Sequence, residues 1–180
     1  MSEKETAGAT LSLEPLLLGG LFRAIGTPDV PLLAMSEAQR RYVHRDLRHW
    51  ASYWGVPFRW PSRFPVRTVA ALRLFLAAAD EPEAAAWPLC QALFCALWVA
   101  DRDLADEAVL EEVAGEVGLD GAALLATSRS AAIKEKLRRR TDRAAARGIF
   151  GVPTFVVGEE LYLGQDRLDF VARALAGAPP

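Results

Sequence analysis

The hydrophobic period of the chain changes once, close to its C-terminal end, and this change restricts the possible folds most. Over residues 36–148 apolar side chains recur at helical spacing. Thr154 to Val157 (T-F-V-V) and Leu161 to Leu163 (L-Y-L) are instead β-branched or aromatic, and the turn residues 158–160 separate them. This pattern predicts a hairpin, and a final amphipathic helix follows over 166–176.

The N-terminal end shows a second strand-like pattern. Thr10 to Leu16 (T-L-S-L-E-P-L) alternates apolar and polar residues and ends at Pro15 and Gly19-Gly20, which predicts a short strand. The predicted order is therefore strand, many helices, hairpin and helix. That order indicates an α/β fold in a single domain.

The helical part carries clear start and stop signals. Ser36 and Gln39 form a capping box, and Gly55 ends the helix that they open. We expect that helix to bury one apolar stripe, and the helix around Leu89 to be central to the core together with Phe94. The stripe consists of Tyr42, Val43, Leu47, Trp50 and Trp54. Further predicted boundaries are the Asp80-Glu81-Pro82 turn and helix starts at Asp106, Asp120 and either Ser128 or Ser130.

The composition fits one globular domain and argues against several classes of protein. The chain has 180 residues, of which 52% are hydrophobic, and its net charge of -2 is too balanced for a dedicated nucleic-acid binder. Met1 to Thr10 has no apolar core of a signal peptide, and Leu89 to Ala100 is about half the ~20 residues that a spanning helix needs. We therefore expect a cytoplasmic protein with no nucleic-acid partner and no membrane partner.

The cysteines and histidines do not form a catalytic or metal-binding set. Cys90 and Cys95 are five positions apart, so they make no Cys-x-x-Cys pair and are expected to be buried structural thiols. His44 and His49 have the same spacing, and no further histidine is available. We expect no metal site.

Two short segments carry the most chemistry. Gly151-Val152-Pro153-Thr154 leads into the first hairpin strand, where a proline removes a backbone donor. A cis peptide bond there would leave the N–H and C=O of Val152 free for an outside peptide. Gly164-Gln165-Asp166-Arg167 opens the last helix, where a carboxylate and free amides suit a small zwitterionic peptide. A plain turn followed by a helix cap fits the same residues.

Three stretches of the chain closely resemble 2-hydroxychromene-2-carboxylate isomerases. They are P-L-L-L-G-G-L-F-R-A-I-G (15–26), G-V-P-F-R-W-P-S-R-F-P-V-R-T-V-A-A-L-R (55–73) and G-I-F-G-V-P-T-F-V-V-G-E-E-L-Y-L-G-Q-D-R-L (148–168). These isomerases belong with kappa-class glutathione transferases to the DsbA-like branch of the thioredoxin fold. The likeness extends over residues 8–177.

The resemblance implies one DsbA-like thioredoxin domain over 1–180 with a large all-α insertion. The thioredoxin parts would be residues 8–20 and 128–177, and the insertion would be residues 21–127. The first strand and first helix of the family, with a Ser-Pro-x-Ser turn whose serine contacts the glutathione sulfur, are expected to lie upstream of Met1. No catalytic residue is therefore assigned within residues 1–180.

The resemblance also implies glutathione as cofactor and assigns residues to it. Val152 would pair its backbone with the cysteinyl unit, and Pro153 would be the cis proline. Gln165 and Asp166 would hold the γ-glutamyl end, with Arg167 beside them. Two further positions are Thr27, where relatives often have an asparagine that touches glutathione, and Arg63, in the loop over 61–65 that resembles the substrate-side loop.

The function implied by the resemblance is glutathione-dependent isomerisation of a small aromatic carboxylate in aromatic-compound catabolism, by a homodimer. One alternative is a non-catalytic protein that keeps a glutathione site. A second alternative, a DsbA-type thiol-disulfide oxidoreductase, is disfavoured because the sequence has no Cys-x-x-Cys.

Overall fold

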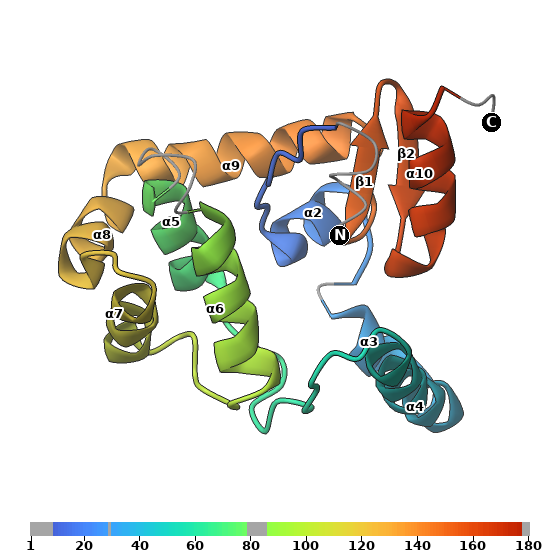
Figure 1. Cartoon of the computed structure of the whole chain (residues 1–180), viewed down its shortest axis with the longest axis horizontal. Coiled ribbons are helices and arrows are strands. Elements are labelled where there is room, and N and C mark those ends of the chain that lie inside the picture. Colours follow the sequence, from blue (N-terminus) through green and yellow to red (C-terminus); the bar gives the residue numbers. More distant parts are fainter. Residues whose placement is uncertain (1–8, 29, 79–85, 178–180) are drawn as a thin grey trace.

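The computed structural model describes residues 9–28, 30–78 and 86–177 (Figure 1). Helices dominate it, and the strands come late in the chain, as the change of period predicted. In chain order the elements are α2 (Leu18–Ala24), α3 (Pro31–Ala34), α4 (Glu37–Tyr53), α5 (Val69–Ala78), α6 (Ala86–Trp98), α7 (Glu107–Glu116), α8 (Gly121–Ser128), α9 (Ala131–Ala146), β1 (Thr154–Val157), β2 (Glu160–Leu163), the 3-10 helix η2 (Gln165–Arg167) and α10 (Leu168–Leu175).

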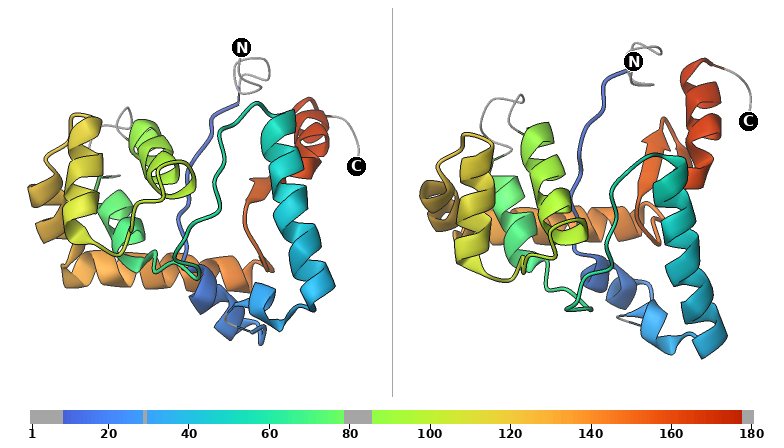
Figure 2. Two further views of the ribbon diagram at one scale, coloured as in Figure 1. Left: turned by 90° about the horizontal axis from the view of Figure 1, so that it is seen from below. Right: turned by 60° about the horizontal axis from the view of Figure 1, so that its bottom comes forward.

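The long helix α9 connects the two ends of the molecule. Helices α5 to α8 gather around its first half, whereas α2 and the hairpin lie at its other end (Figures 1 and 2). The main apolar cluster belongs to the first group: its buried residues run from Ala71 to Leu137 and include the fully buried Leu74, Leu89 and Leu110. The hydrophobic core is therefore helical and lies away from the hairpin.

Side-chain caps explain where several helices begin. Ser36 and Gln39 form the predicted capping box at the start of α4. Asp106 and Asp120 accept hydrogen bonds from the first turns of α7 and α8. Ser130 caps α9, which decides between the two predicted serines. The predicted Asp80-Glu81-Pro82 turn lies outside the described residues.

The predicted hairpin forms. β1 and β2 pair antiparallel, with Thr154 opposite Leu163 and Val157 opposite Glu160. Among the described residues the sheet has these two strands and no others. Helix α10 packs on the hairpin and buries Val171.

The predicted strand over Thr10 to Leu16 is wrong. This segment is extended but pairs with no strand in the part of the chain that the structure describes. Helical contacts hold it instead: Glu14 forms an ion pair with Arg140 of α9, and the N–H of Leu17 donates to Oγ1 of Thr141 at 3.0 Å. An alternating pattern fits any extended segment with one buried side, so it does not by itself specify a sheet.

The predicted apolar stripe of α4 is also wrong. This helix contains no buried residue, and the side chains of Tyr42 and Trp54 are 61% and 47% exposed. In α6, Leu89 is buried as expected, but Phe94 is 61% exposed. Aromatic residues at helical spacing can equally line an open surface, as those of α4 do.

No helix among the described residues combines the length and apolar character needed to cross a membrane. The division into thioredoxin parts and a helical insertion at residues 21 and 127 stays a prediction. Helix α9 packs against both α2 and α5, so it belongs structurally to both groups of elements.

Candidate functional site

The two segments singled out in the sequence lie side by side. The Val152–Pro153 peptide bond is cis, as predicted. The N–H of Gly164 donates to the carbonyl oxygen of Pro153 at 2.9 Å, which joins the entrance of β1 to the start of η2. Oγ1 of Thr154 donates to the carbonyl oxygen of Gly151 at 2.7 Å and fixes the turn before the strand. Residues eleven positions apart in sequence therefore form one corner of the hairpin.

Val152 is exposed at this corner. Its side chain is 49% exposed, and within the described ranges its backbone N–H and C=O take part in no backbone hydrogen bond. Backbone groups that are not paired by the fold need water or a ligand as partner. The structure thus leaves Val152 available for pairing with an extended peptide.

Asp166 stands at the first turn of the helical segment that follows β2. Its Oδ2 accepts a hydrogen bond from Nη1 of Arg167 at 2.7 Å. Gly164 has φ +98°, and a Cβ there would lie 2.4 Å from Oδ1 of Asp166. The carboxylate therefore rests directly against the backbone of a glycine, which fixes its position beside the Pro153 corner.

An open cleft of about 540 Å³ separates α4 from η2 and the start of α10. Polar and aromatic side chains form its walls. On the α4 side these are Asp46, His49, Trp50, Tyr53 and Trp54, and on the opposite side Gln165, Asp166, Leu168 and Asp169. Two of the predicted glutathione residues, Gln165 and Asp166, thus line this cleft. Trp50 and Trp54, which were predicted to be buried, line it from the other side.

The cleft combines negative charge with aromatic surface. Its carboxylates come from both walls, and the rings of Trp50, Tyr53 and Trp54 meet edge to face, with centroids 5.7 Å and 5.1 Å apart. Such a lining suits the ammonium group of a small zwitterion. The signal for the α4 wall was present in the sequence, because Asp46, Trp50 and Tyr53 share one helix face.

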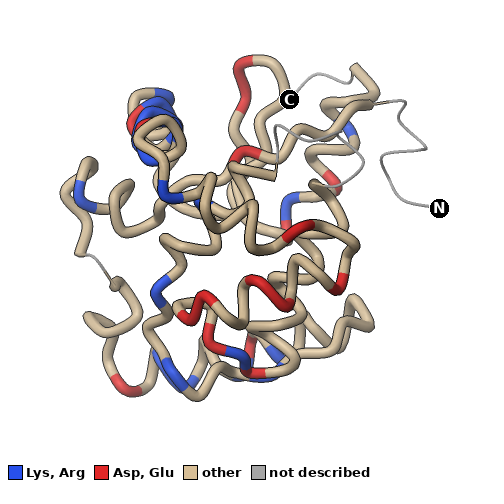
Figure 3. Tube along the Cα trace, turned by 90° about the vertical axis from the view of Figure 1, so that its left-hand side faces the viewer, with Lys and Arg blue, Asp and Glu red and all other residues tan. Residues whose placement is uncertain are grey.

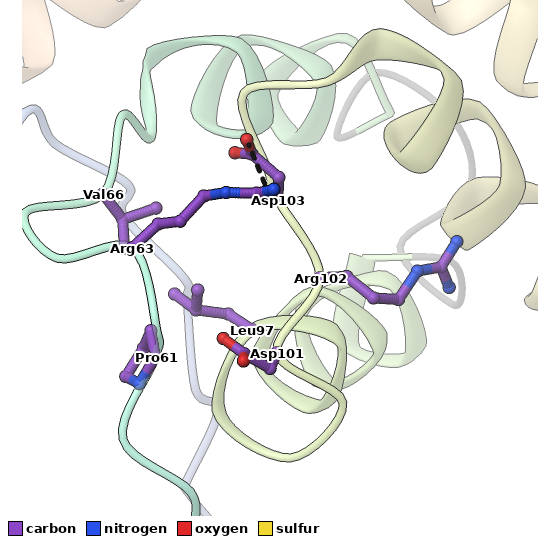
Figure 4. A pocket seen from close by; sticks show the side chains of 7 residues that line it. All are labelled: Pro61, Arg63, Val66, Leu97, Asp101, Arg102 and Asp103. Carbon is purple, nitrogen blue, oxygen red and sulfur yellow. Dashed lines mark hydrogen bonds and ion pairs between the residues drawn. The ribbon is translucent and has the colours of Figure 1, made fainter.

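Thr27 and Arg63 lie outside this cleft. The N–H of Thr27 donates to the carbonyl oxygen of Phe22 and ends α2. Nη1 of Arg63 contacts Oδ2 of Asp103 at 3.4 Å, beside a small cavity that Asp101 also lines (Figure 4). The structure therefore brings Gln165 and Asp166 together with the Val152 corner, but not Thr27 or Arg63.

The thiols and histidines offer no alternative reactive centre. Both cysteines lie on α6, and burial raises the pKa of the Cys90 thiol, which disfavours its nucleophilic thiolate form. The prediction of two buried thiols is wrong for Cys95, which is exposed. In the ranges 9–28, 30–78 and 86–177, no group of three or more His, Cys, Asp or Glu side chains could hold a metal ion.

Basic and acidic residues are interleaved along the trace (Figure 3). On α9, Arg138 bonds both Glu135 and Asp142, so part of the basic run of this helix is neutralised within the helix itself. These ion pairs between exposed side chains are typical of a solvated helix face.

Comparisons with known proteins point in one direction. The family model "DSBA-like thioredoxin domain" matches residues 2–176. A 2-hydroxychromene-2-carboxylate isomerase of Sphingobium xenophagum is 32% identical over 83% of this chain and 79% of its own length. Glutathione s-transferase kappa 2 of Caenorhabditis elegans is 26% identical over 92% of this chain and 78% of its own length.

A solved structure agrees with these relatives. The structure of a selenomethionine 2-hydroxychromene-2-carboxylate isomerase superposes with a TM-score of 0.86 at 25% identity, covering 97% of this chain and 83% of that chain. The fold described above is therefore a DsbA-like thioredoxin fold, with a large helical part and a small antiparallel sheet.

Proposed function

Because the chain belongs to the DsbA-like thioredoxin family, in the group that contains the 2-hydroxychromene-2-carboxylate isomerases, we propose that it is a glutathione-dependent isomerase of that type. The observation that carries the proposal is the hydrogen bond from Gly164 to Pro153. It places an unpaired backbone segment, Val152, next to the carboxylate of Asp166 at the mouth of a cleft.

In this proposal glutathione lies along that corner. The cysteinyl unit pairs with the backbone of Val152, whose N–H and C=O face no backbone partner in the described ranges. The γ-glutamyl ammonium binds Asp166, and its carboxylate approaches the free amides at the start of η2, beside Gln165. Arg167 holds the Asp166 carboxylate in place through the hydrogen bond from its Nη1.

The chemistry comes from the glutathione sulfur. When bound, glutathione would supply a thiol whose thiolate form can add reversibly to the conjugated double bond of the substrate, and Val152, Gln165 and Asp166 would hold it at the corner. A free thiol with a pKa of about 8.5 is only partly ionised at neutral pH. The 180 residues contain no Ser-Pro-x-Ser sequence, so no side chain is assigned to stabilise the thiolate.

A non-catalytic glutathione-binding protein is the second candidate, because the residues assigned to the corner and the cleft have binding roles and none of them is assigned a role in turnover. A protein of this kind would bind glutathione at the same site as the proposed isomerase but would not convert a substrate. A thiol-disulfide oxidoreductase is disfavoured, because Cys90 and Cys95 make no Cys-x-x-Cys pair and burial raises the pKa of Cys90.

Calorimetry and a turnover assay separate these candidates. The isomerase requires saturable glutathione binding and glutathione-dependent conversion of 2-hydroxychromene-2-carboxylate. Binding without turnover of this or related aromatic carboxylates supports the second candidate, and an absence of binding contradicts both. We also propose that the protein is a cytoplasmic homodimer. Sedimentation equilibrium with and without glutathione tests the dimer, and cell fractionation tests the location.

A further inference from the structure

Asp101 ties the segment over Arg59 to Ser62 to the C-terminal end of α6. Its Oδ1 accepts a hydrogen bond from the N–H of Ser62 at 2.7 Å, and its Oδ2 lies 3.3 Å from Nη2 of Arg59. A third contact runs alongside, because the N–H of Arg59 donates to the carbonyl oxygen of Trp98 at 2.6 Å. Figure 4 shows the Asp101 carboxylate turned toward the segment that carries Pro61 and Arg63.

The backbone of Asp101 is in an unusual conformation. Asp101 has φ +57° and is the sole non-glycine residue of the described ranges with a positive φ. This region is costly for most L-residues, and aspartate tolerates it better than many others. The Asp101 side chain is only 14% exposed, and both of its carboxylate oxygens have a partner. These contacts offset the backbone cost.

The segment that Asp101 holds carries Trp60, which sits between two helices. The Trp60 ring centroid lies 3.9 Å from the ring of His44 on α4 and 6.1 Å from the ring of Trp98 at the end of α6. Phe64 packs on the same indole at 5.0 Å. Trp60 therefore joins α4 to the helical core, and the Asp101 contacts determine where Trp60 lies.

Helix α4 depends on this contact more than a buried helix would. It contains no buried residue, so packing against the core does not fix it strongly. His44 meets Trp60 on one side of the helix, whereas Asp46, about 200° further around it, faces the cleft toward Gln165 and Asp166. A shift of Trp60 would therefore move the α4 wall and change the width of the cleft.

We propose that Asp101 is a positioning residue: by holding Trp60 against His44 it fixes α4 and thereby the width of the cleft that Gln165 and Asp166 line. The effect on α4 follows from the contacts alone. The effect on glutathione binding rests on the proposed function.

Fluorine NMR of protein labelled with 5-fluorotryptophan tests both steps. The five tryptophans report separate places: Trp60 and Trp98 the contact that Asp101 fixes, Trp50 and Trp54 the cleft, and Trp87 the exposed start of α6 as internal reference. The main variant is Asp101→Gly, because glycine adopts φ +57° without strain while the side chain with its carboxylate is removed. Glu112→Gln is the matched control, since it removes an exposed carboxylate that pairs with the neighbouring Arg102.

In Asp101→Gly we expect the Trp60, Trp98, Trp50 and Trp54 resonances to move and the Trp87 resonance to stay, with an unchanged thermal midpoint. Asp101→Asn keeps an acceptor for the N–H of Ser62, so most of these resonances should return to their positions in the unmodified protein. Glu112→Gln should move none of them. An unchanged Trp60 resonance in Asp101→Gly would contradict the claim that Asp101 holds Trp60 in place. A changed Trp60 resonance with unchanged Trp50 and Trp54 resonances would contradict the effect on the cleft.

Glutathione added to the labelled proteins separates this inference from the proposed function. We expect glutathione to shift Trp50 and Trp54 in the unmodified protein, with an affinity weakened about five- to tenfold in Asp101→Gly. A wild-type protein that does not respond to glutathione contradicts the proposed function while leaving the α4 result standing. Equal affinity of the two proteins contradicts the coupling.

Discussion

Asp166 is the residue on which the proposed binding mode depends most. Its carboxylate lies at the mouth of the cleft and is oriented by Arg167. We predict that Asp166→Ala weakens glutathione binding by about 1–3 kcal/mol, since the γ-glutamyl ammonium loses its charged partner. Calorimetry measures this change. Asp142→Ala, which removes an exposed carboxylate on α9 that does not line the cleft, should leave the affinity as it was.

Gly164 offers an independent test of the position of that carboxylate. A methyl group on Gly164 would come within 2.4 Å of Oδ1 of Asp166, so Gly164→Ala should displace the carboxylate and reduce glutathione affinity about tenfold. Gly158→Ala is the matched control, because Gly158 also has a positive φ, +61°, but its added methyl meets nothing within 4 Å. Gly164→Ala should also lose more stability than Gly158→Ala, because φ +98° with ψ 155° is a region that essentially only glycine occupies. Equal glutathione affinities of the two variants would place Asp166 outside the site.

The residues of the site differ in how far the sequence could reveal them. Gly-Val-Pro-Thr before a strand and Asp166 at a helix start follow from local chemistry, and the structure places both at one corner. Asp101 gave no such signal, because its role depends on Ser62, which lies thirty-nine positions earlier. Local sequence patterns predict the backbone conformation of one segment. A contact between segments far apart in sequence can be identified only once the fold is known.

Helices α7 and α8 approach each other closely at Gly121. A Cβ at Gly121 would lie 2.4 Å from the carbonyl oxygen of Glu111, which is backbone and cannot rotate away. We predict that Gly121→Ala lowers the free energy of unfolding by about 1–3 kcal/mol. Chemical denaturation checks this value.

Gly115→Ala is the control for that variant. Gly115 is within α7, and its added methyl meets nothing within 4 Å. This substitution should raise the free energy of unfolding by about 0.5–1 kcal/mol, because alanine favours the helix. If both variants destabilise equally, the close approach of α7 and α8 is not what makes Gly121 necessary.

At the level of elements, the sequence predicted where helices begin better than it predicted what packs against them. The caps at Ser36, Asp106 and Asp120 were predicted because each depends on residues within one turn. The strand over 10–16 and the buried stripe of α4 were wrong. Both depend on what lies opposite an extended or aromatic face, which the spacing of residues in one segment does not contain.

For the whole molecule, stability is expected to be uneven. The main core cluster lies in α5 to α9 and the loops between them, whereas the hairpin has two strands and half-exposed side chains. We predict strong hydrogen-exchange protection at Leu89 to Val99 and weak protection at Phe155 to Leu163. Firm protection of the hairpin in the free protein would show that its stability does not follow the distribution of buried apolar surface.

The overall fold was predictable as a DsbA-like thioredoxin fold because three separate stretches carried the resemblance. The cleft was not, since its α4 wall and its Asp166 wall are more than a hundred positions apart in sequence. The helical part, the hairpin and α9 between them bring these walls together (Figure 2). The proposed binding site therefore depends on how α4 is placed relative to η2 and α10.

The central claim is that glutathione binds at the corner formed by Val152, Pro153 and the start of η2. Backbone amide shifts in 1H–15N spectra during a glutathione titration test it most directly. We predict saturable shifts of the amides of Val152, Gln165 and Asp166, and no shift of the buried amides of α7 and α8. Shifts confined to other parts of the chain, or no saturable shift at all, would contradict the account.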